Sequence, residues 1–164
     1  MNIERFNIWG RDNEGYMDLQ NHKYYYIKDH LGSVRVVFNE SNNIVSAQDY
    51  NMWGSLMEGR GFDSAKSKYK FTGKERDKES NYDYFGARYY DSRIGRWGSV
   101  EPLQSSYLQY SPYTYGLLNP IHYNDSNGKD ATITINGNKI EISFTFNFEE
   151  LNAIKEGWKY QDEK

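Results

Sequence analysis

Three residues of the types used in nucleophilic catalysis lie close together near the start of the chain. Asp29 and His30 are adjacent, and Ser33 follows three positions later. A serine nucleophile needs a histidine base that an acid orients, and all three side chains must converge. Nothing else in the sequence supports such a triad, whereas an aspartate before glycine often satisfies the N–H groups of a turn. We therefore expect Asp29 to form a turn in KDHLGSVR.

Chemistry that depends on a cofactor has little support. The chain has 3 histidines and no cysteine, and His22, His30 and His122 lack the spacing of metal ligands. The segment WGSLMEGRG (53–61) is rich in glycine but lacks the Lys-Ser/Thr pair of a phosphate-binding loop. We expect no metal and no other cofactor.

The composition favours half-buried strands. The chain has 164 residues, which suits one domain, and 16 of them are tyrosine, although hydrophobic residues make up only 37%. Tyrosine packs its ring inward while its hydroxyl reaches water, as on a strand with one exposed face. The net charge of −3 gives no basic field, so we expect no nucleic-acid partner. Tyrosines can also stack on sugars, so a free-standing glycan-binding module stays an alternative.

Residues 1–62 have the pattern of consecutive hairpins. FNIWG is a short aromatic strand that ends at a glycine, and KYYYIKDH and LGSVRVVFNE are two strands joined by a turn near residues 29–32. A further pair of strands turns at Asn42-Asn43, which tolerate positive φ. This region is expected to be an antiparallel meander.

Residues 63–128 are less regular. Residues 63–69 are polar and are expected to form a loop, and from there glycine and aspartate alternate with tyrosine and phenylalanine. Residues 99–128 contain all three prolines of the chain, which argues against a central strand.

The pattern changes after Gly128. ATITI and NKIEI flank Asn136-Gly137, the pair that favours a two-residue hairpin turn. Asn147 can then cap a helix with Glu150 as its reciprocal partner. The apolar residues that follow at helical spacing are Leu151, Ile154 and Trp158. Residues 129–164 are therefore expected to begin a separate unit.

Three long segments resemble the RHS repeat-associated core domain, which ends the tyrosine-aspartate (YD) repeat proteins of bacteria. They are YYYIKDHLGSVRVV (24–37), YKFTGKERDKESNYDYFGARYYDSRIGRW (69–97) and EPLQSSYLQYSPYTYGLLNPIHYNDSNG (101–128). FNIWG and QDYNMWG (48–54) resemble the repeat strands upstream of that domain. The resemblance covers roughly residues 6–128 and implies a mainly β fold, in which antiparallel hairpins end a YD-repeat β-shell, followed by an irregular plug and a short C-terminal helix.

The resemblance also implies a different role for each of three regions of the chain. Residues 1–62 would end the β-ribbon, residues 63–128 would be the core that plugs the shell, and residues 129–164 would start a variable, truncated, toxin-type tail. The core would close the shell and enclose or present that tail. The implied partners are the tail itself, an upstream YD-repeat shell, and an immunity protein for a full-length tail.

Family members further resemble an aspartyl protease that cuts its own chain. The arginine of the ARYYD motif is Arg88, and the aspartate of the closing D-P-x-G motif is Asp125. Glu101 stands where the family has its other aspartate, and Ser126 stands where it has proline. The resemblance therefore makes Arg88, Glu101 and Asp125 the candidate catalytic residues for cleavage just after Gly128.

The required chemistry is demanding. Two close carboxyls share one proton, so one can activate a nucleophile while the other polarises the scissile carbonyl, and an arginine sets the asymmetry. The extra methylene of Glu101 displaces its carboxyl, and a shift near 1 Å can cost about a hundredfold in rate. Activity as an enzyme is therefore uncertain from the sequence, and a shell-closing role is the first expectation.

Each candidate residue also has a structural interpretation. Asp125 in NDSNG could form a turn and have no catalytic role. Glu101 before a proline could be a solvated acid in a loop. Arg88 could stack on a neighbouring tyrosine, Tyr84, Tyr89 or Tyr90, and bridge a carboxylate.

No apolar run has the roughly 18 residues of a membrane span, and MNIERFNIWGRD lacks the apolar core of a signal peptide. We expect a secreted or cell-surface location as part of a longer protein.

Overall fold

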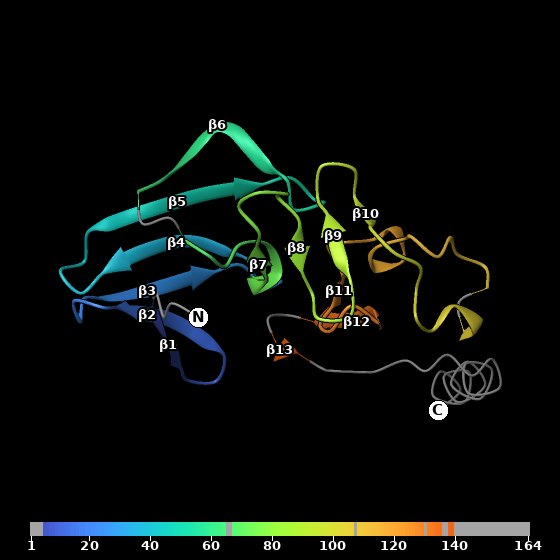
Figure 1. Ribbon diagram of the computed structural model, residues 1–164, viewed down its shortest axis with the longest axis horizontal. Helices are drawn as coiled ribbons and strands as arrows, with labels where there is room; N and C mark the ends of the chain where they lie inside the picture. Colours follow the sequence, from blue (N-terminus) through green and yellow to red (C-terminus); the bar gives the residue numbers. More distant parts are fainter. Residues whose placement is uncertain (1–4, 65–66, 107, 130, 136–137, 140–164) are drawn as a thin grey trace, which may run out of the picture.

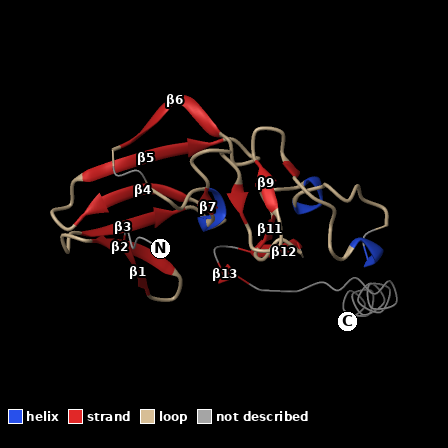
Figure 2. Ribbon diagram, in the orientation of Figure 1, coloured by secondary structure: helices blue, strands red, loops and turns tan. Residues whose placement is uncertain are grey.

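The computed structural model describes residues 5–64, 67–106, 108–129, 131–135 and 138–139. Its described part is built of antiparallel strands with three short 3-10 turns, so the predicted mainly β fold is confirmed (Figures 1 and 2). The predicted helix that begins after Asn147 and the turn residues Asn136-Gly137 lie outside the described residues.

The N-terminal half forms a six-stranded sheet in which each strand pairs with the next, as the predicted meander requires (Figure 1). The strands are β1 (Arg5–Trp9), β2 (Asn13–Asp18), β3 (Lys23–Lys28), β4 (Val34–Asn39), β5 (Ile44–Tyr50) and β6 (Leu56–Asp63). β1 and β6 are the edge strands of this sheet.

Four of the five hairpins of this sheet share one kind of turn, and only the β1–β2 connection differs. At each end an aspartate or asparagine accepts, through Oδ1, the backbone N–H groups two and four positions later, and the residue three positions later has positive φ. Such a loop matches a type I turn followed by a left-handed residue. The residues that accept these bonds are Asp18, Asp29, Asn39 and Asn51. The turn predicted at Asn42-Asn43 therefore begins at Asn39, and Asn42 is its left-handed residue.

The C-terminal half contains two smaller sheets joined by irregular segments, which include the proline-rich region. β7 (Glu75–Arg76), β8 (Asp83–Tyr84), β9 (Tyr89–Asp91) and β10 (Arg96–Trp97) form one sheet. β11 (Tyr123–Asp125), β12 (Ala131–Ile135) and β13 (Asn138–Lys139) form the other. The 3-10 turns are η1 (Phe71–Gly73), η2 (Gln104–Ser106) and η3 (Gly116–Leu118). Ile135 lies opposite Asn138, as the predicted hairpin of the tail requires.

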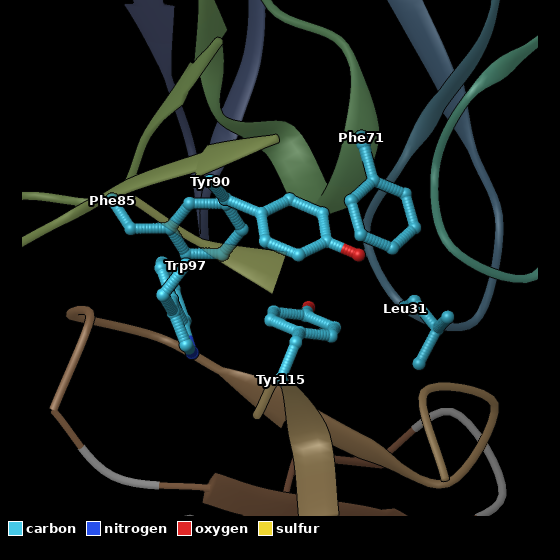
Figure 3. Close-up of a cluster of buried hydrophobic side chains, with 6 residues drawn as sticks. All are labelled: Leu31, Phe71, Phe85, Tyr90, Trp97 and Tyr115. Atoms are coloured by element: carbon cyan, nitrogen blue, oxygen red, sulfur yellow. The ribbon is translucent and has the colours of Figure 1, made fainter. Parts of the chain in front are cut away.

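The main core is a cluster of aromatic rings from the C-terminal half, against which Leu31 of the N-terminal half packs (Figure 3). Tyr90 and Tyr115 are fully buried at its centre, with ring centroids 4.4 Å apart. Around them lie Leu31, Phe71, Phe85 and Trp97. Five of the six buried residues of this cluster are therefore aromatic, in a sequence that has few aliphatic residues.

A second, smaller cluster lies on the six-stranded sheet and consists of Tyr16, Tyr26, Val34 and Val37. The segment after β6 links the two clusters, because Tyr69 packs against the second one and Phe71 belongs to the first. The Val34 N–H donates to the Lys70 carbonyl at 3.0 Å, which fixes this segment on β4.

η3 has an unusual backbone. Gly116, Leu117 and Leu118 have φ values of +52°, +49° and +64°, so three consecutive residues are left-handed. This conformation costs a non-glycine residue roughly 1–2 kcal/mol. Leu118 is 67% exposed, so its side chain gains little burial that could offset the cost.

Candidate functional site

Arg88 lies in the tight connection between β8 and β9 and is the centre of the site. Gly86 provides a φ of +100° at this corner, and the Phe85 N–H donates to the Arg88 carbonyl at 3.1 Å. The corner directs the arginine side chain inward, where only 1% of it is exposed. Burial lowers the pKa of Arg88, and the neighbouring Glu101 and Asp125 carboxylates oppose that shift.

The structure brings together the three residues that the sequence singled out. Arg88 Nη2 lies 2.7 Å from Glu101 Oε2 and 3.2 Å from Asp125 Oδ2. Arg88 Nε donates to the Gly128 carbonyl oxygen at 2.7 Å. One guanidinium therefore binds two carboxylates and the carbonyl of Gly128, the residue after which cleavage was predicted.

The ring of Trp97, on β10, stacks against this guanidinium, with 3.9 Å between the Arg88 Cζ and the ring centroid. The predicted stacking partner was a tyrosine, but Tyr84 and Tyr89 are about half exposed and pack against each other. The indole face restrains Arg88 through a cation–π contact.

Asp125 ends β11 and holds a turn of the kind found in the six-stranded sheet. Its Oδ1 accepts the N–H groups of Asn127, Gly128 and Lys129 at 3.1, 2.6 and 3.1 Å. Burial raises the pKa of Asp125 to about 6, although Arg88 and the three N–H groups act in the opposite direction. The turn interpretation of Asp125 is therefore correct, and the residue also faces Arg88 through Oδ2.

Glu101 is held on both sides of its carboxylate. Oε1 accepts the Leu103 N–H at 3.0 Å, while Oε2 pairs with Arg88. Only 12% of the side chain is exposed, so the interpretation as a solvated loop acid is wrong. The bond to Leu103 is local, within the loop that Pro102 begins.

All three carbonyls of the turn after Asp125 are bound by distant parts of the chain. Lys74 Nζ donates to the Ser126 carbonyl at 2.6 Å, the Ala87 N–H donates to the Asn127 carbonyl at 3.1 Å, and Arg88 binds the third. Sequence reasoning missed Lys74, although it lies in the KFTGKERD segment that carried the family resemblance. Both the N–H groups and the carbonyls of this turn are therefore hydrogen-bonded. We call the groups that bind the turn, from Lys74, Ala87, Arg88 and Asp125, the clasp.

A small cavity of about 20 Å³ adjoins this clasp and is lined by Arg88, Glu101 and Asp125, among others. A cavity of this size holds about one water molecule. Arg88 Nη1 is buried and donates to no described residue. The Gly128–Lys129 peptide therefore has a cation at its oxygen, a carboxylate at its nitrogen, and room for water nearby.

The triad considered at the start of the chain does not form. Asp29 binds the N–H groups of its turn, as predicted. His30 Nε2 faces the Ile121 carbonyl at 3.2 Å, and Ser33 Oγ accepts the Thr72 N–H. Among the described residues, no group of His, Asp and Glu has the arrangement of a metal site.

Comparison with known proteins identifies a family and several relatives. The family model of the teneurin YD-shell matches residues 11–128. Salivary gland surface protein 1 of Aedes aegypti is 34% identical over 119 residues, 71% of this chain and 3% of that protein. The tRNA(Glu)-specific nuclease WapA of Bacillus subtilis subsp. natto is 30% identical over 118 residues, 70% of this chain and 5% of that protein.

A solved structure agrees with these sequence matches. A chain in the Tc holotoxin pore of Photorhabdus luminescens is 26% identical, with a TM-score of 0.60. The match covers 76% of this chain and 6% of that one. The chain therefore spans only a small part of the length of the relatives it matches. In the part that the structure describes, no helix is long and apolar enough to cross a membrane.

Proposed function

Because this chain belongs to the teneurin YD-shell family, we propose that it closes one end of a β-shell and holds the start of a C-terminal tail there. The RHS-type resemblance agrees with this family, and two of the matched relatives are, by name, a nuclease and a toxin pore. By analogy, the tail that follows residue 128 would be of toxin type, and the whole protein would be secreted or carried on a cell surface. Its partners would be the upstream shell, its own tail, and an immunity protein for a full-length tail.

The clasp on residues 126–129 is the observation that carries this proposal. Lys74, Ala87 and Arg88 bind the carbonyls of this turn, and Asp125 binds its N–H groups. These groups are provided by the segment after η1, the β8–β9 corner and β11. A buried arginine with two carboxylates keeps the turn in one geometry, because separating any pair would leave a charge without a partner. The clasp would therefore fix the chain at the point where the proposed tail begins.

A chimera tests shell closure directly. Residues 11–128 would replace the matching segment of the Tc toxin chain of Photorhabdus luminescens, and electron microscopy would show whether the particle is closed. We expect a closed particle for the native segment and an opened end when Arg88→Met is introduced. A native segment that leaves the end open, in a toxin that otherwise assembles, would contradict the proposed role.

Self-cleavage is the second candidate, and the arrangement around the Gly128–Lys129 peptide favours it. Arg88 Nε contacts its carbonyl oxygen, and Asp125 Oδ1 lies 3.1 Å from its nitrogen. We propose that Glu101 takes a proton from a water as the water oxygen attacks the Gly128 carbonyl carbon. Arg88 would stabilise the oxyanion, and protonated Asp125 would give its proton to the Lys129 nitrogen as the C–N bond breaks. The products are a Gly128 carboxylate and a Lys129 amine.

The intact mass of the purified chain tests this candidate. Two species that divide at residues 128–129 are expected for the wild type, and one full-length species is expected for Asp125→Asn. Because burial raises the pKa of Asp125 to about 6, more of the acid is protonated at pH 5 than at pH 8, so cleavage should be faster at pH 5. A full-length wild type at both pH values would contradict self-cleavage, and Glu101→Asp in the same assay would show whether the longer side chain is responsible.

A further inference from the structure

The turn that the clasp holds contains an Asn-Gly pair, Asn127 and Gly128. In such a pair the glycine nitrogen can attack the asparagine Cγ, because glycine has no side chain and its backbone turns freely. A C–N bond forms, the glycine N–H proton leaves with the side-chain nitrogen as ammonia, and a five-membered cyclic imide results. Water then opens the imide to aspartate or to isoaspartate, in which the main chain runs through the former side chain.

The glycine of this pair is required by the clasp. Gly128 has a φ of +78°, and an added Cβ would lie 3.0 Å from the Arg88 nitrogen and 3.3 Å from the Ala87 nitrogen. Both the backbone conformation and the close approach therefore disfavour any side chain at this position. With asparagine before it, the turn necessarily contains a dipeptide that is chemically reactive.

The closed clasp holds both ends of the peptide group that would react. The Gly128 N–H donates to Asp125 Oδ1 at 2.6 Å, and the Asn127 carbonyl accepts the Ala87 N–H at 3.1 Å. To reach the side chain, this peptide group must rotate about the Asn127 Cα–C bond, and rotation breaks both hydrogen bonds. Because Gly128 is buried, water can replace these partners only after the turn has opened.

Asp125 also opposes the chemistry electrostatically. The attacking Gly128 nitrogen must give up its proton and pass through a state with negative charge. In mildly alkaline buffer, above the pKa of about 6 that burial gives Asp125, the adjacent carboxylate is charged and disfavours that state. The Asn127 side chain is restrained as well, since its Oδ1 accepts the Lys129 N–H at 2.9 Å.

The isoaspartate product would not fit the clasp. It adds one methylene to the main chain before Gly128, which displaces the N–H that Asp125 binds and the carbonyl that Arg88 binds. Hydrogen bonds of this kind weaken steeply when distance and angle change. We propose that Asn127 is a deamidation site that the closed clasp shields, and that its conversion to isoaspartate after opening prevents the clasp from closing again. This proposal rests on the clasp and needs neither shell closure nor self-cleavage.

Peptide mapping by mass spectrometry of the full chain, kept in mildly alkaline buffer, tests the shielding. Deamidation at Asn127 should be roughly tenfold or more slower in native buffer than in denaturing urea, because only molecules with an open clasp react. The other Asn-Gly pair, at residues 136–137, is the internal reference: in urea the two pairs should react at similar rates. Equal rates at Asn127 in native buffer and in urea would overturn the proposal. Full-length and self-cleaved chains differ in mass, so the outcome for self-cleavage is read separately.

Two variants show whether the clasp itself provides the shielding. Lys74→Met removes the bond to the Ser126 carbonyl and should accelerate deamidation at Asn127 roughly threefold or more in native buffer. Gly61→Ala is the matched control, because its added Cβ would lie 2.5 Å from the Ala47 carbonyl oxygen and strain the six-stranded sheet instead. It should change the rate at Asn127 by less than about twofold. Equal acceleration by both variants would mean that only global unfolding exposes Asn127, and local shielding would then be wrong.

Hydrogen exchange at the Ala87 amide tests whether opening becomes irreversible, because this amide binds the Asn127 carbonyl. Isoaspartate-containing chain is separated from unmodified chain of the same incubated sample, which serves as the reference. We expect the Ala87 amide to exchange roughly tenfold or more faster in the isoaspartate form. Asn127→Asp adds the charge without the methylene and should have a smaller effect. Equal protection in the isoaspartate form and the reference would overturn the irreversible step.

Discussion

Arg88 shows how much one buried side chain can organise. It binds Glu101, Asp125 and the Gly128 carbonyl at once, and Trp97 covers its face. The planar guanidinium can reach all of these partners because its donors point in fixed, separate directions, which a lysine ammonium cannot reproduce.

We therefore expect Arg88→Lys to destabilise the chain although it keeps the charge. The loss of one or two hydrogen bonds to charged groups should lower the free energy of unfolding by roughly 2–4 kcal/mol. Urea denaturation measures the change. Arg93→Lys is the control, since Arg93 forms an exposed pair with Asp91, and its substitution should change stability far less than Arg88→Lys does. Equal effects of the two substitutions would contradict a special role for Arg88.

Asp125 makes stability depend on pH. Its pKa is raised to about 6 by burial, so between about pH 4 and pH 6 the folded chain binds a proton that the unfolded chain has released. Stability from this group therefore falls as pH rises through this window, by roughly 2–3 kcal/mol in total. Relative to Asp125→Asn, the wild type should lose stability between pH 4.5 and pH 7.5 in urea denaturation. A relative gain would show that the pKa is lowered instead.

At the level of single residues, the sequence predicted part of the site. Arg88, Glu101 and Asp125 could be found because motifs carried them, and the structure places them together. Lys74 and Trp97 were missed as contacts of the site, because they approach it only through folding: Lys74 lies 52 positions from Ser126. The burial of Glu101 could not be predicted either, since it depends on Arg88 and not on neighbours in the chain.

Among the elements, the turns place the strictest demands on residue type. Gly54 has a φ of +89°, and an added Cβ would lie 2.4 Å from the Phe71 ring. Gly59 has a φ of +72° but nothing within 4 Å of an added Cβ. Substitutions at these two glycines therefore distinguish the cost of backbone strain from the cost of a steric clash.

Gly59→Ala should lower the free energy of unfolding by about 1 kcal/mol, through backbone strain alone. Gly54→Ala should cost roughly 1–3 kcal/mol more, because the aromatic core must move. Thermal and urea denaturation of both variants check this order. Similar costs for the two would mean that the Phe71 ring yields easily.

η3 stores strain that a glycine would relieve. Leu118 is left-handed and 67% exposed, so Leu118→Gly should stabilise the chain by up to about 1 kcal/mol, the strain relief exceeding the entropy cost of glycine. Leu108→Gly is the control: Leu108 is also exposed but does not have positive φ, and its replacement should not stabilise. Loss of stability in Leu118→Gly would show that its side chain contributes more than its exposure indicates.

The elements were predicted unevenly. The strands around residues 23–50 were found because aromatic and β-branched runs end at turn residues, and the structure confirms them. The left-handed Gly116–Leu118 turn was not predictable, since leucine disfavours this conformation and only tertiary packing imposes it. The separation of β6 from β5 at Met57–Arg60, which have no partner on β5, was also missed, because a period-2 pattern does not reveal where a ladder separates.

Across the whole molecule, burial is concentrated at two clusters and is weakest at the edge of the large sheet. Val34 and Val37 on β4, like Tyr90 and Tyr115, are fully buried, whereas every residue of β6 is exposed. Local opening should follow this gradient, since segments with few buried contacts open at low free energy.

Hydrogen exchange followed by mass spectrometry should therefore show β6 exchanging roughly a hundredfold or more faster than β4. The amides of Met57–Arg60 should be the fastest within β6, because they have no partner on β5. Protection of β6 equal to that of β4 in the free chain would contradict the gradient.

The turn at Asp125 also has an evolutionary meaning. Its Oδ1 bonds to the second and fourth following N–H groups, and its left-handed glycine repeats what Asp29 and Asn51 do at ordinary hairpins. Duplication of one such hairpin would carry the loop with it, so the carboxylate and the N–H groups it binds would be inherited together. What distinguishes the copy at Asp125 is a buried arginine with a second acid. New sites of this kind could therefore arise by point substitution around an old loop, without any new backbone.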